Sequence, residues 1–381
     1  MQSEDGKHVS WLEVDLDAIG HNMREIRRVI GPDVKLLAVV KDNAYGHGDI
    51  AVAKEVLANG ADYLAVATVD EGVGLRENGI QAPILVLNHV TLTDIELAVK
   101  HDLVLTVYSL FITELINQQA QAFGKKAKIH IKVDTGMNRV GFLCNEASLN
   151  EIAAIAALPN LEMEGVFSHF ATTNLNDDHY AEKQMNHFTD FIAQLQNRGL
   201  TFPLKHMASS GVIFTLPQAY FDMIRPGIMI YGGYPGQQFH DRIDLRPALS
   251  LKTHVSLVKE IPEGSAVSYG LRWRSSKPSV IATLPLGYGR GIRRSYFDGG
   301  QVLIHGKRVP IVGTICMDHM MVDVSDLRDV KLDDEAVLIG TQGSETILME
   351  EMATAVNSIS YEIFSSISNR LPYVYIHSGL K

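Results

Sequence analysis

The chain has 381 residues, of which 46% are hydrophobic and 20% charged, with a formal net charge of -10. This length favours two domains, and this composition is typical of a globular enzyme with a sizeable core. The acidic balance argues against a nucleic-acid partner, which needs clustered Lys and Arg, and no apolar run approaches the roughly 20 residues of a membrane span.

The first elements of the chain are a strand and a helix. Residues 11–16 alternate between apolar and polar side chains, which predicts a half-buried strand. Asp17 is expected to cap a helix that runs to about Val29. The preceding residues 1–5 are polar and acidic and do not resemble a signal peptide.

The stretch from Leu36 to Gly48 is the segment around which the rest of the chain is organised. It opens with five apolar residues, a pattern that indicates a strand buried on both faces, and then breaks at Lys41 into a Gly-rich polar turn. Lys41 is therefore predicted to lie at the carboxyl end of a strand. A partly desolvated lysine there can serve as a nucleophile toward carbonyls, although an ordinary surface lysine fits the same pattern.

Eight such apolar runs occur in the first 245 residues, separated by segments of helical length such as 50–59 and 178–197. The predicted strands are residues 36–40, 63–67, 84–87, 103–107, 128–133, 165–168, 204–207 and 223–225. This alternation predicts a closed (β/α)8 barrel (a TIM barrel), with an open doubly wound sheet as the rival.

Active groups of such barrels lie just after the strand ends. The polar residues and the glycine that follow the eight predicted strands are Lys41, Thr68, Asn88, Tyr108, Asp134 and Arg139, His169, Ser209 and Ser210, and Arg225 and Gly227. Gly227 allows a close backbone approach and Ser210 offers a hydroxyl, which indicates a phosphate site after the eighth strand, although Pro-Gly is also common in simple turns. A phosphate site beside Lys41 points to pyridoxal 5'-phosphate (PLP).

The pattern changes near Arg246 to short strands with turn signals, at residues 249–258, 266–269, 280–284, 301–305, 310–315, 321–324 and 336–339. Helical spacing returns at residues 349–357. We therefore predict a PLP-binding barrel over 1–245 and a mainly β domain over 246–381.

Seven segments of the chain are distinctive and occur in order: residues 39–48, 132–141, 168–171, 225–232, 268–270, 313–318 and 361–363. They resemble motifs of the alanine racemase family, within a likeness that runs from Trp11 to Tyr375. The resemblance implies a fold-type III PLP enzyme without a metal. It would interconvert L- and D-alanine, supply D-alanine for peptidoglycan, and work as a homodimer with shared active sites.

The resemblance also implies two catalytic residues. Lys41 would bond to the cofactor aldehyde and act as acid or base on one face of the substrate Cα. Tyr269 would act on the opposite face, reaching the barrel mouth of the partner subunit. Two bases on opposite faces are what racemisation requires, because one removes the proton and the other returns it from behind.

The remaining implied roles concern binding. Arg225 would face the pyridine nitrogen of PLP and leave it unprotonated, because guanidinium keeps its proton, and His169 would orient Arg225. The phosphate would be bound by Tyr45, Ser210, Gly227, Ile228 and Tyr361. The substrate carboxylate would be held by Arg139 and the N–H of Met317, with Lys132 at a position that is carbamylated in many relatives. The entrance would be narrowed by Tyr269, Tyr288 and Tyr361.

Two positions depart from the family pattern and bear on substrate breadth. Arg290 stands where Asp is common, and Ser209 where Asn is frequent. A serine or broader amino-acid racemase therefore remains open. A PLP-dependent decarboxylase is disfavoured by Arg225, and a single-barrel PLP-holding protein by the second domain. Only Cys144 and Cys316 occur, which is compatible with a reducing compartment and predicts a cytoplasmic location.

Overall fold

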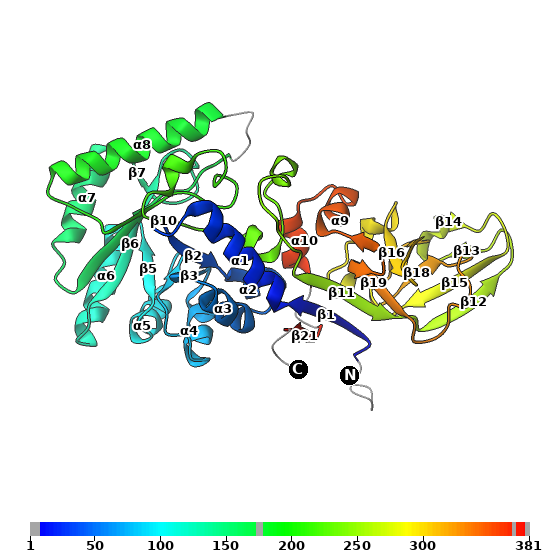
Figure 1. The fold of residues 1–381 in the computed structure, drawn as a ribbon. Helices are drawn as coiled ribbons and strands as arrows, with labels where there is room; N and C mark the ends of the chain where they lie inside the picture. Colours follow the sequence, from blue (N-terminus) through cyan, green and yellow to red (C-terminus); the bar gives the residue numbers. More distant parts are fainter. Residues whose placement is uncertain (1–7, 173–177, 368–370, 378–381) are drawn as a thin grey trace.

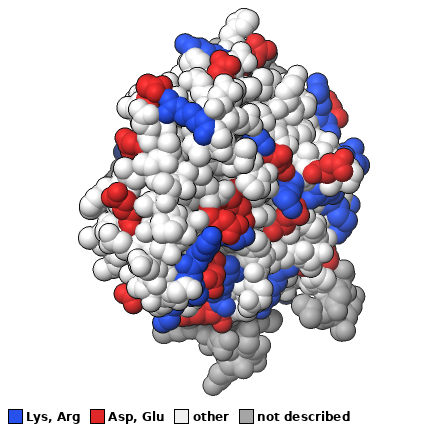
Figure 2. All heavy atoms as spheres, turned by 90° about the vertical axis from the view of Figure 1, so that its left-hand side faces the viewer, with Lys and Arg blue, Asp and Glu red and all other residues white. Residues whose placement is uncertain are grey.

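The computed structural model describes residues 8–172, 178–367 and 371–377 (Figure 1). The helix-flanked strands of the N-terminal part form one lobe and the strands of the C-terminal part form the other, with α9 (Met349–Ala355) and α10 (Ser360–Ser366) between them. Within the described ranges no helix is both long and apolar enough to cross a membrane. Acidic and basic side chains intermingle on the face shown in Figure 2.

The first lobe is a parallel barrel, which confirms the predicted fold class. Its strands pair in the order β10-β2-β3-β4-β5-β6-β8-β9, and an isolated parallel bridge between Ser209 and Arg225 joins the two ends of the sheet. An open sheet is thereby ruled out. The strands are β2 (Lys35–Val39), β3 (Tyr63–Val66), β4 (Ile84–Val86), β5 (Val104–Val107), β6 (Ala127–Asp134), β8 (Leu161–Phe167), β9 (Leu204–His206) and β10 (Met223–Ile224).

Helices cover the outside of the barrel. They are α1 (Leu16–Ile30), α3 (Asp49–Ala58), α4 (Val69–Glu77), α5 (Leu92–Lys100), α6 (Leu110–Ala122), α7 (Glu146–Ala156) and α8 (Asp178–Asn197). The predicted cap of α1 was wrong by two residues, because the side chain of Asp15 accepts the bond from the Ala18 N–H. Asp17 lies in the first turn, where a negative charge is favourable to the helix dipole.

The second lobe contains a sheet that includes the start of the chain. Strand β1 (Ser10–Asp15) pairs antiparallel with β11 (Leu249–His254) and parallel with β21 (Tyr373–Ile376). The single strand predicted over 249–258 is in fact two strands, β11 and β12 (Leu257–Ile261). They lie in different sheets, and residues 255–256 between them belong to neither strand. The division at 245/246 stays a prediction.

Other strands begin or end at different residues than predicted, because the backbone is not extended at certain positions. In place of residues 310–315, the structure has β17 (Lys307–Pro310), joined to β16 (Gln301–Ile304) by a tight turn with positive φ at His305 and Gly306. Strand β13 (Ala266–Val267) stops early because Ser268 has φ 65°. The other strands are β7 (Phe142–Leu143), β14 (Trp273–Arg274), β15 (Ser279–Leu284), β18 (Met320–Asp323), β19 (Glu335–Gln342) and β20 (Glu345–Ile347).

Candidate active site

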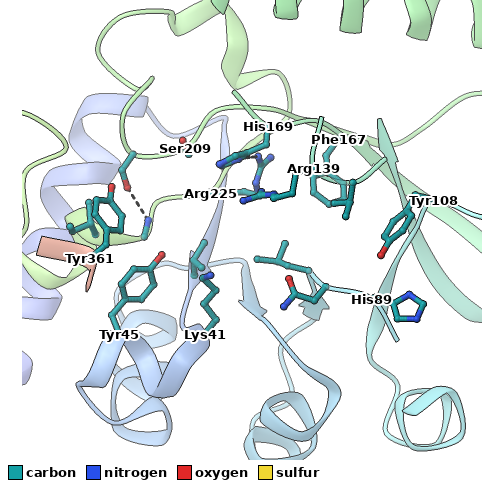
Figure 3. Close-up of a pocket in the computed structure, with 17 residues that line it drawn as sticks. Lys41, Tyr45, His89, Tyr108, Arg139, Phe167, His169, Ser209, Arg225 and Tyr361 are labelled. Atoms are coloured by element: carbon teal, nitrogen blue, oxygen red, sulfur yellow. Dashed lines mark hydrogen bonds between the residues drawn. The ribbon is translucent and has the colours of Figure 1, made fainter. Parts of the chain in front are cut away.

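A cavity of about 500 Å³ opens at the carboxyl ends of the barrel strands (Figure 3). It brings together nearly all of the residues predicted at those ends, and it adds His89, which sequence reasoning missed. Its lining includes Lys41, Tyr45, Asn88, Tyr108, Arg139, His169, Ser209, Ser210, Arg225, Gly227, Ile228 and Tyr361. Thr68 does not line it, because its hydroxyl and Glu71 form the N-terminal capping box of α4.

Lys41 begins a turn with left-handed backbone. The next four residues, from Asp42 to Tyr45, have φ between 51° and 54° and ψ between 38° and 53°. Left-handed geometry costs L-residues about 1–2 kcal/mol each, so neighbouring segments must hold this turn. Asn43 does so by donating to the Tyr373 hydroxyl at 2.8 Å and accepting from the Asp49 N–H at 3.0 Å. The sequence showed only that a turn occurs here, since the bond to Tyr373 joins residues 330 positions apart.

Buried aromatic side chains support the turn from behind. The Nδ1 of His47 lies 3.1 Å and 3.0 Å from the carbonyl oxygens of Ala44 and Tyr45, and burial lowers the pKa of His47 to about 4, so it is a neutral donor. Its ring packs on Tyr231, whose hydroxyl donates to the Val39 carbonyl. Lys41 and Tyr45 consequently point into the cavity from one braced turn.

A small cradle lies beside Tyr45. The N–H of Gly227 donates to the Ser210 hydroxyl at 2.9 Å, and a Cβ added at Gly227 would lie 2.7 Å from the Tyr45 hydroxyl. Only glycine therefore leaves this space open. Tyr361 enters from α10, and burial raises its pKa to about 12, so it keeps its proton at neutral pH. Protonated hydroxyls around an open backbone site suit a phosphate group.

Arg225 lies at the inner side of the cavity and is buried. Its Nη2 approaches His169 Nδ1 at 3.1 Å and donates to the Ser168 and Met207 carbonyl oxygens at 2.8 Å and 3.0 Å. Burial lowers the pKa of Arg225 to about 9, which still leaves a cation at neutral pH. The predicted contact of His169 with Arg225 is present. His206, 2.8 Å away through Nδ1, was not predicted, because a lone histidine in a short strand resembles an ordinary core residue.

Lys132 is a buried lysine on which the charges of Arg225 and Arg139 both act. Lys132 is buried on β6, where its Nζ donates to the Val133 carbonyl at 3.0 Å and lies 5.2 Å from the centre of the Phe167 ring. Burial, followed by the charge of Arg225, lowers the pKa of Lys132 to about 7. A substantial share of this amine is therefore uncharged at neutral pH.

Tyr269 and Met317 do not line the cavity of their own chain. They are 70% and 55% exposed, and both lie in the second lobe. The loops that carry them are nevertheless ordered by specific bonds: the Thr314 hydroxyl donates to the Tyr269 carbonyl at 2.8 Å, and the Gly289 N–H donates to the Met317 carbonyl at 2.8 Å. Tyr288, also exposed, lies outside the cavity as well.

Comparisons with known sequences agree over nearly the whole chain. Residues 14–235 match the family described as "Alanine racemase, N-terminal domain", and residues 248–375 match "Alanine racemase, C-terminal domain". The chain is 45% identical to "Alanine racemase 2" of Caldanaerobacter subterraneus over 97% of this chain and 95% of that protein. It is also 45% identical to "Alanine racemase" of Methanococcus maripaludis, over 97% and 99% of the two chains.

Solved structures agree in fold. An alanine racemase of Clostridium difficile 630 superposes with a TM-score of 0.94 at 37% identity, covering 98% of this chain and 97% of that one. An alanine racemase from Bacillus anthracis with bound L-Ala-P gives a TM-score of 0.91 at 38% identity, covering 98% and 96%. The similarity spans both lobes.

Proposed function

The chain belongs to the alanine racemase family, and on this premise we propose how its own residues interconvert L- and D-alanine with PLP. The observation that carries the proposal is the single cavity that joins Lys41, the Ser210–Gly227 cradle and buried Arg225. When bound, PLP supplies an electron sink for the pair left at Cα as its proton departs. The other roles in the reaction belong to side chains and backbone groups of the protein.

The cradle and Arg225 give the cofactor its orientation. Tyr45, Tyr361, Ser210 and the backbone at Gly227 and Ile228 would bind the phosphate at one end. Arg225, held by His169, would face the ring nitrogen. Because the guanidinium only donates, it leaves that nitrogen without a proton and moderates the electron sink. A weaker electron sink would favour prompt return of the proton to Cα and suppress transamination.

Lys41 and Tyr269 are the two groups that move the proton. Lys41 would hold the cofactor through Nζ and would exchange a proton with one face of Cα. Tyr269 would exchange a proton with the other face through its hydroxyl. Because Tyr269 and Met317 are exposed and lie outside the cavity of their own chain, we propose that a partner copy contributes them, so that the active unit is a homodimer.

Arg139 and the Met317 N–H would hold the substrate carboxylate. A charge-assisted bond from Arg139, which lines the cavity, would keep Cα between the two bases. Tyr269, Tyr288 and Tyr361 would narrow the entrance and favour a small side chain. Arg290 and Ser209, which depart from the family pattern, lie outside the proton-transfer groups and would affect substrate breadth.

We also propose a cytoplasmic enzyme whose D-alanine serves peptidoglycan. Both cysteines are free, as a reducing compartment allows. The division into a barrel over 1–245 and a mainly β domain over 246–381 is kept as part of the proposal, with β1 (Ser10–Asp15) joining the second sheet.

The reaction is tested by incubating the purified PLP-loaded protein with L-alanine. We expect D-alanine to accumulate until the two enantiomers are equal, with no carbon dioxide released. Released carbon dioxide would indicate a decarboxylase, and no change in L-alanine would indicate a PLP-holding protein. A panel of L-amino acids that includes L-serine, followed by loss of optical rotation, defines the substrate breadth that Arg290 and Ser209 leave open.

We propose that Lys132 is carbamylated. Its neutral amine would add to carbon dioxide, forming an N–C bond and releasing one proton, and the resulting carboxylate would offset the charges of Arg139 and Arg225. In ¹³C-bicarbonate, the native protein is expected to give a carbamate ¹³C signal that Lys132→Met removes. Lys205→Met, a change on another barrel strand, β9 (Leu204–His206), is expected to retain the signal. A free amine alone at Lys132 under these conditions would refute this modification.

A further inference from the structure

A chain of buried hydrogen bonds runs from Arg225 away from the cavity. Arg225 Nη1 lies 2.8 Å from His206 Nδ1, and His206 Nε2 lies 2.9 Å from His130 Nδ1. His130 Nε2 lies 3.2 Å from Glu164 Oε2, and Glu164 Oε1 accepts from Lys128 Nζ at 2.5 Å. Both histidines are fully buried and Glu164 is 6% exposed, whereas the Lys128 side chain is 44% exposed.

The two ends of this chain decide where each proton lies. Guanidinium can only donate, so His206 Nδ1 must accept, and His206 must carry its proton on Nε2. That proton points at His130 Nδ1, so His130 must also carry its proton on Nε2, facing Glu164. Each hydrogen bond between Arg225 and Glu164 is then donated in the same direction, from the cation toward the carboxylate.

The charges along the chain are consistent with this assignment. Burial lowers the pKa of both His130 and His206, which keeps the rings neutral. Burial alone would raise the pKa of Glu164, but the bonds from His130 and Lys128 lower it to about 2, so it is an anion at neutral pH. Each polar side chain in this buried row therefore has a partner of the correct kind.

The barrel is built to hold the row in place. A Cβ added at Gly165 would lie 2.7 Å from two atoms of the His130 ring, so glycine makes the room that this histidine occupies. The Phe167 ring stacks on His206 with centroids 4.7 Å apart, and the Arg225 guanidinium lies 5.2 Å from the same ring. Rotation of either histidine or of Arg225 is thereby restricted.

We propose that Glu164 is the buried counter-anion of Arg225, and that His206 and His130 connect the two. The row acts as a positioning device: His206 occupies one edge of the guanidinium, so that the remaining N–H groups stay directed toward the cavity. Glu164, at the other end of the row, would then influence the electrostatic field of Arg225 at the cofactor ring. This inference rests on the proposed function, in which Arg225 faces the ring nitrogen of PLP.

Proton positions provide a test that does not depend on activity. In ¹⁵N-histidine-labelled holoenzyme, with His206→Asn and His130→Asn used to assign the signals, we expect both rings to be neutral with the proton on Nε2. A proton on Nδ1 of either ring, or on both nitrogens of one ring, would overturn the row. This holds whether or not Lys41 and Tyr269 have the roles proposed above.

The effect of the anion is tested with a matched pair of variants. Glu162→Gln removes a carboxylate from the same strand that also lies 3.8 Å from Lys128, but that carboxylate is not part of the row. We expect Glu164→Gln to lower kcat roughly tenfold, to weaken PLP binding and to shift the visible absorbance of bound PLP, with Glu162→Gln matching the parent in all three. Equal behaviour of the two variants would refute the proposal; should Glu164→Gln fail to fold, the ¹⁵N measurement decides.

Discussion

Replacing Lys41 with alanine is expected to lower the racemisation rate of L-alanine by at least about 10³-fold. The variant lacks both the amine that would bond to PLP and the group that would exchange a proton on one face of Cα. Lys41 is partly exposed, with its ion pair to Asp42 at 3.4 Å, so the fold does not depend on it. Loss of the visible absorbance of lysine-bound PLP and loss of D-alanine formation should occur together.

Lys35→Ala is the matched control for this change. Lys35 begins strand β2 (Lys35–Val39), at the opposite end from Lys41, and its Nζ lies 3.9 Å from Asp62. We expect this variant to bind PLP and racemise L-alanine as the parent does. If Lys41→Ala instead kept the parental rate, Lys41 would have no role in catalysis.

Tyr269→Phe is expected to slow loss of the α-proton from L-alanine by about 10²–10⁴-fold, the range typical of a positioned acid or base. The cofactor absorbance should persist because Lys41 and the phosphate cradle are unchanged. Exchange of the α-proton in deuterium oxide measures the step directly. A variant that exchanges and racemises at the parental rate would exclude Tyr269 from proton transfer.

Mixing the two inactive variants tests whether the site is shared. In a dimer of one Lys41→Ala chain and one Tyr269→Phe chain, the barrel with intact Lys41 would receive an intact Tyr269 from its partner. Random exchange of subunits should therefore restore about a quarter of the parental activity. Isolation of a heterodimer through a tag on one chain would demonstrate that subunits have exchanged. If that heterodimer showed no activity, each chain would be complete by itself.

The eight barrel strands were predictable because apolar residues dominate most of them and recur between segments of helical length, as buried parallel strands require. This pattern is a local property, and β2 to β6 and β8 to β10 lie within a few residues of the predicted ranges. The second lobe was predicted less well. Its strands are short, and their ends depend on single backbone angles, as at Ser268 (φ 65°) and His305 (φ 52°), that no apolar pattern records.

Much of the cavity was also predictable, because parallel strands bring their carboxyl ends to one edge. Lys41, Arg225 and His169 follow three different strands and line one cavity as expected. Thr68 follows a strand in the same way but serves as a helix cap. A position at a strand end thus brings a side chain to the right rim, while the following helix or turn decides where it points.

By itself, the sequence determined the barrel, the family and the chemistry available at the barrel mouth, because apolar runs and motif residues are properties of single segments. Only tertiary structure decided the left-handed turn after Lys41, where Asn43 binds Tyr373 and His47 packs on Tyr231, and the row from Arg225 to Glu164. Both depend on contacts between residues far apart in the chain. The strained backbone of the turn and the proton positions in the row depend on hydrogen-bond partners from other segments. Those partners come into contact only when the chain has folded.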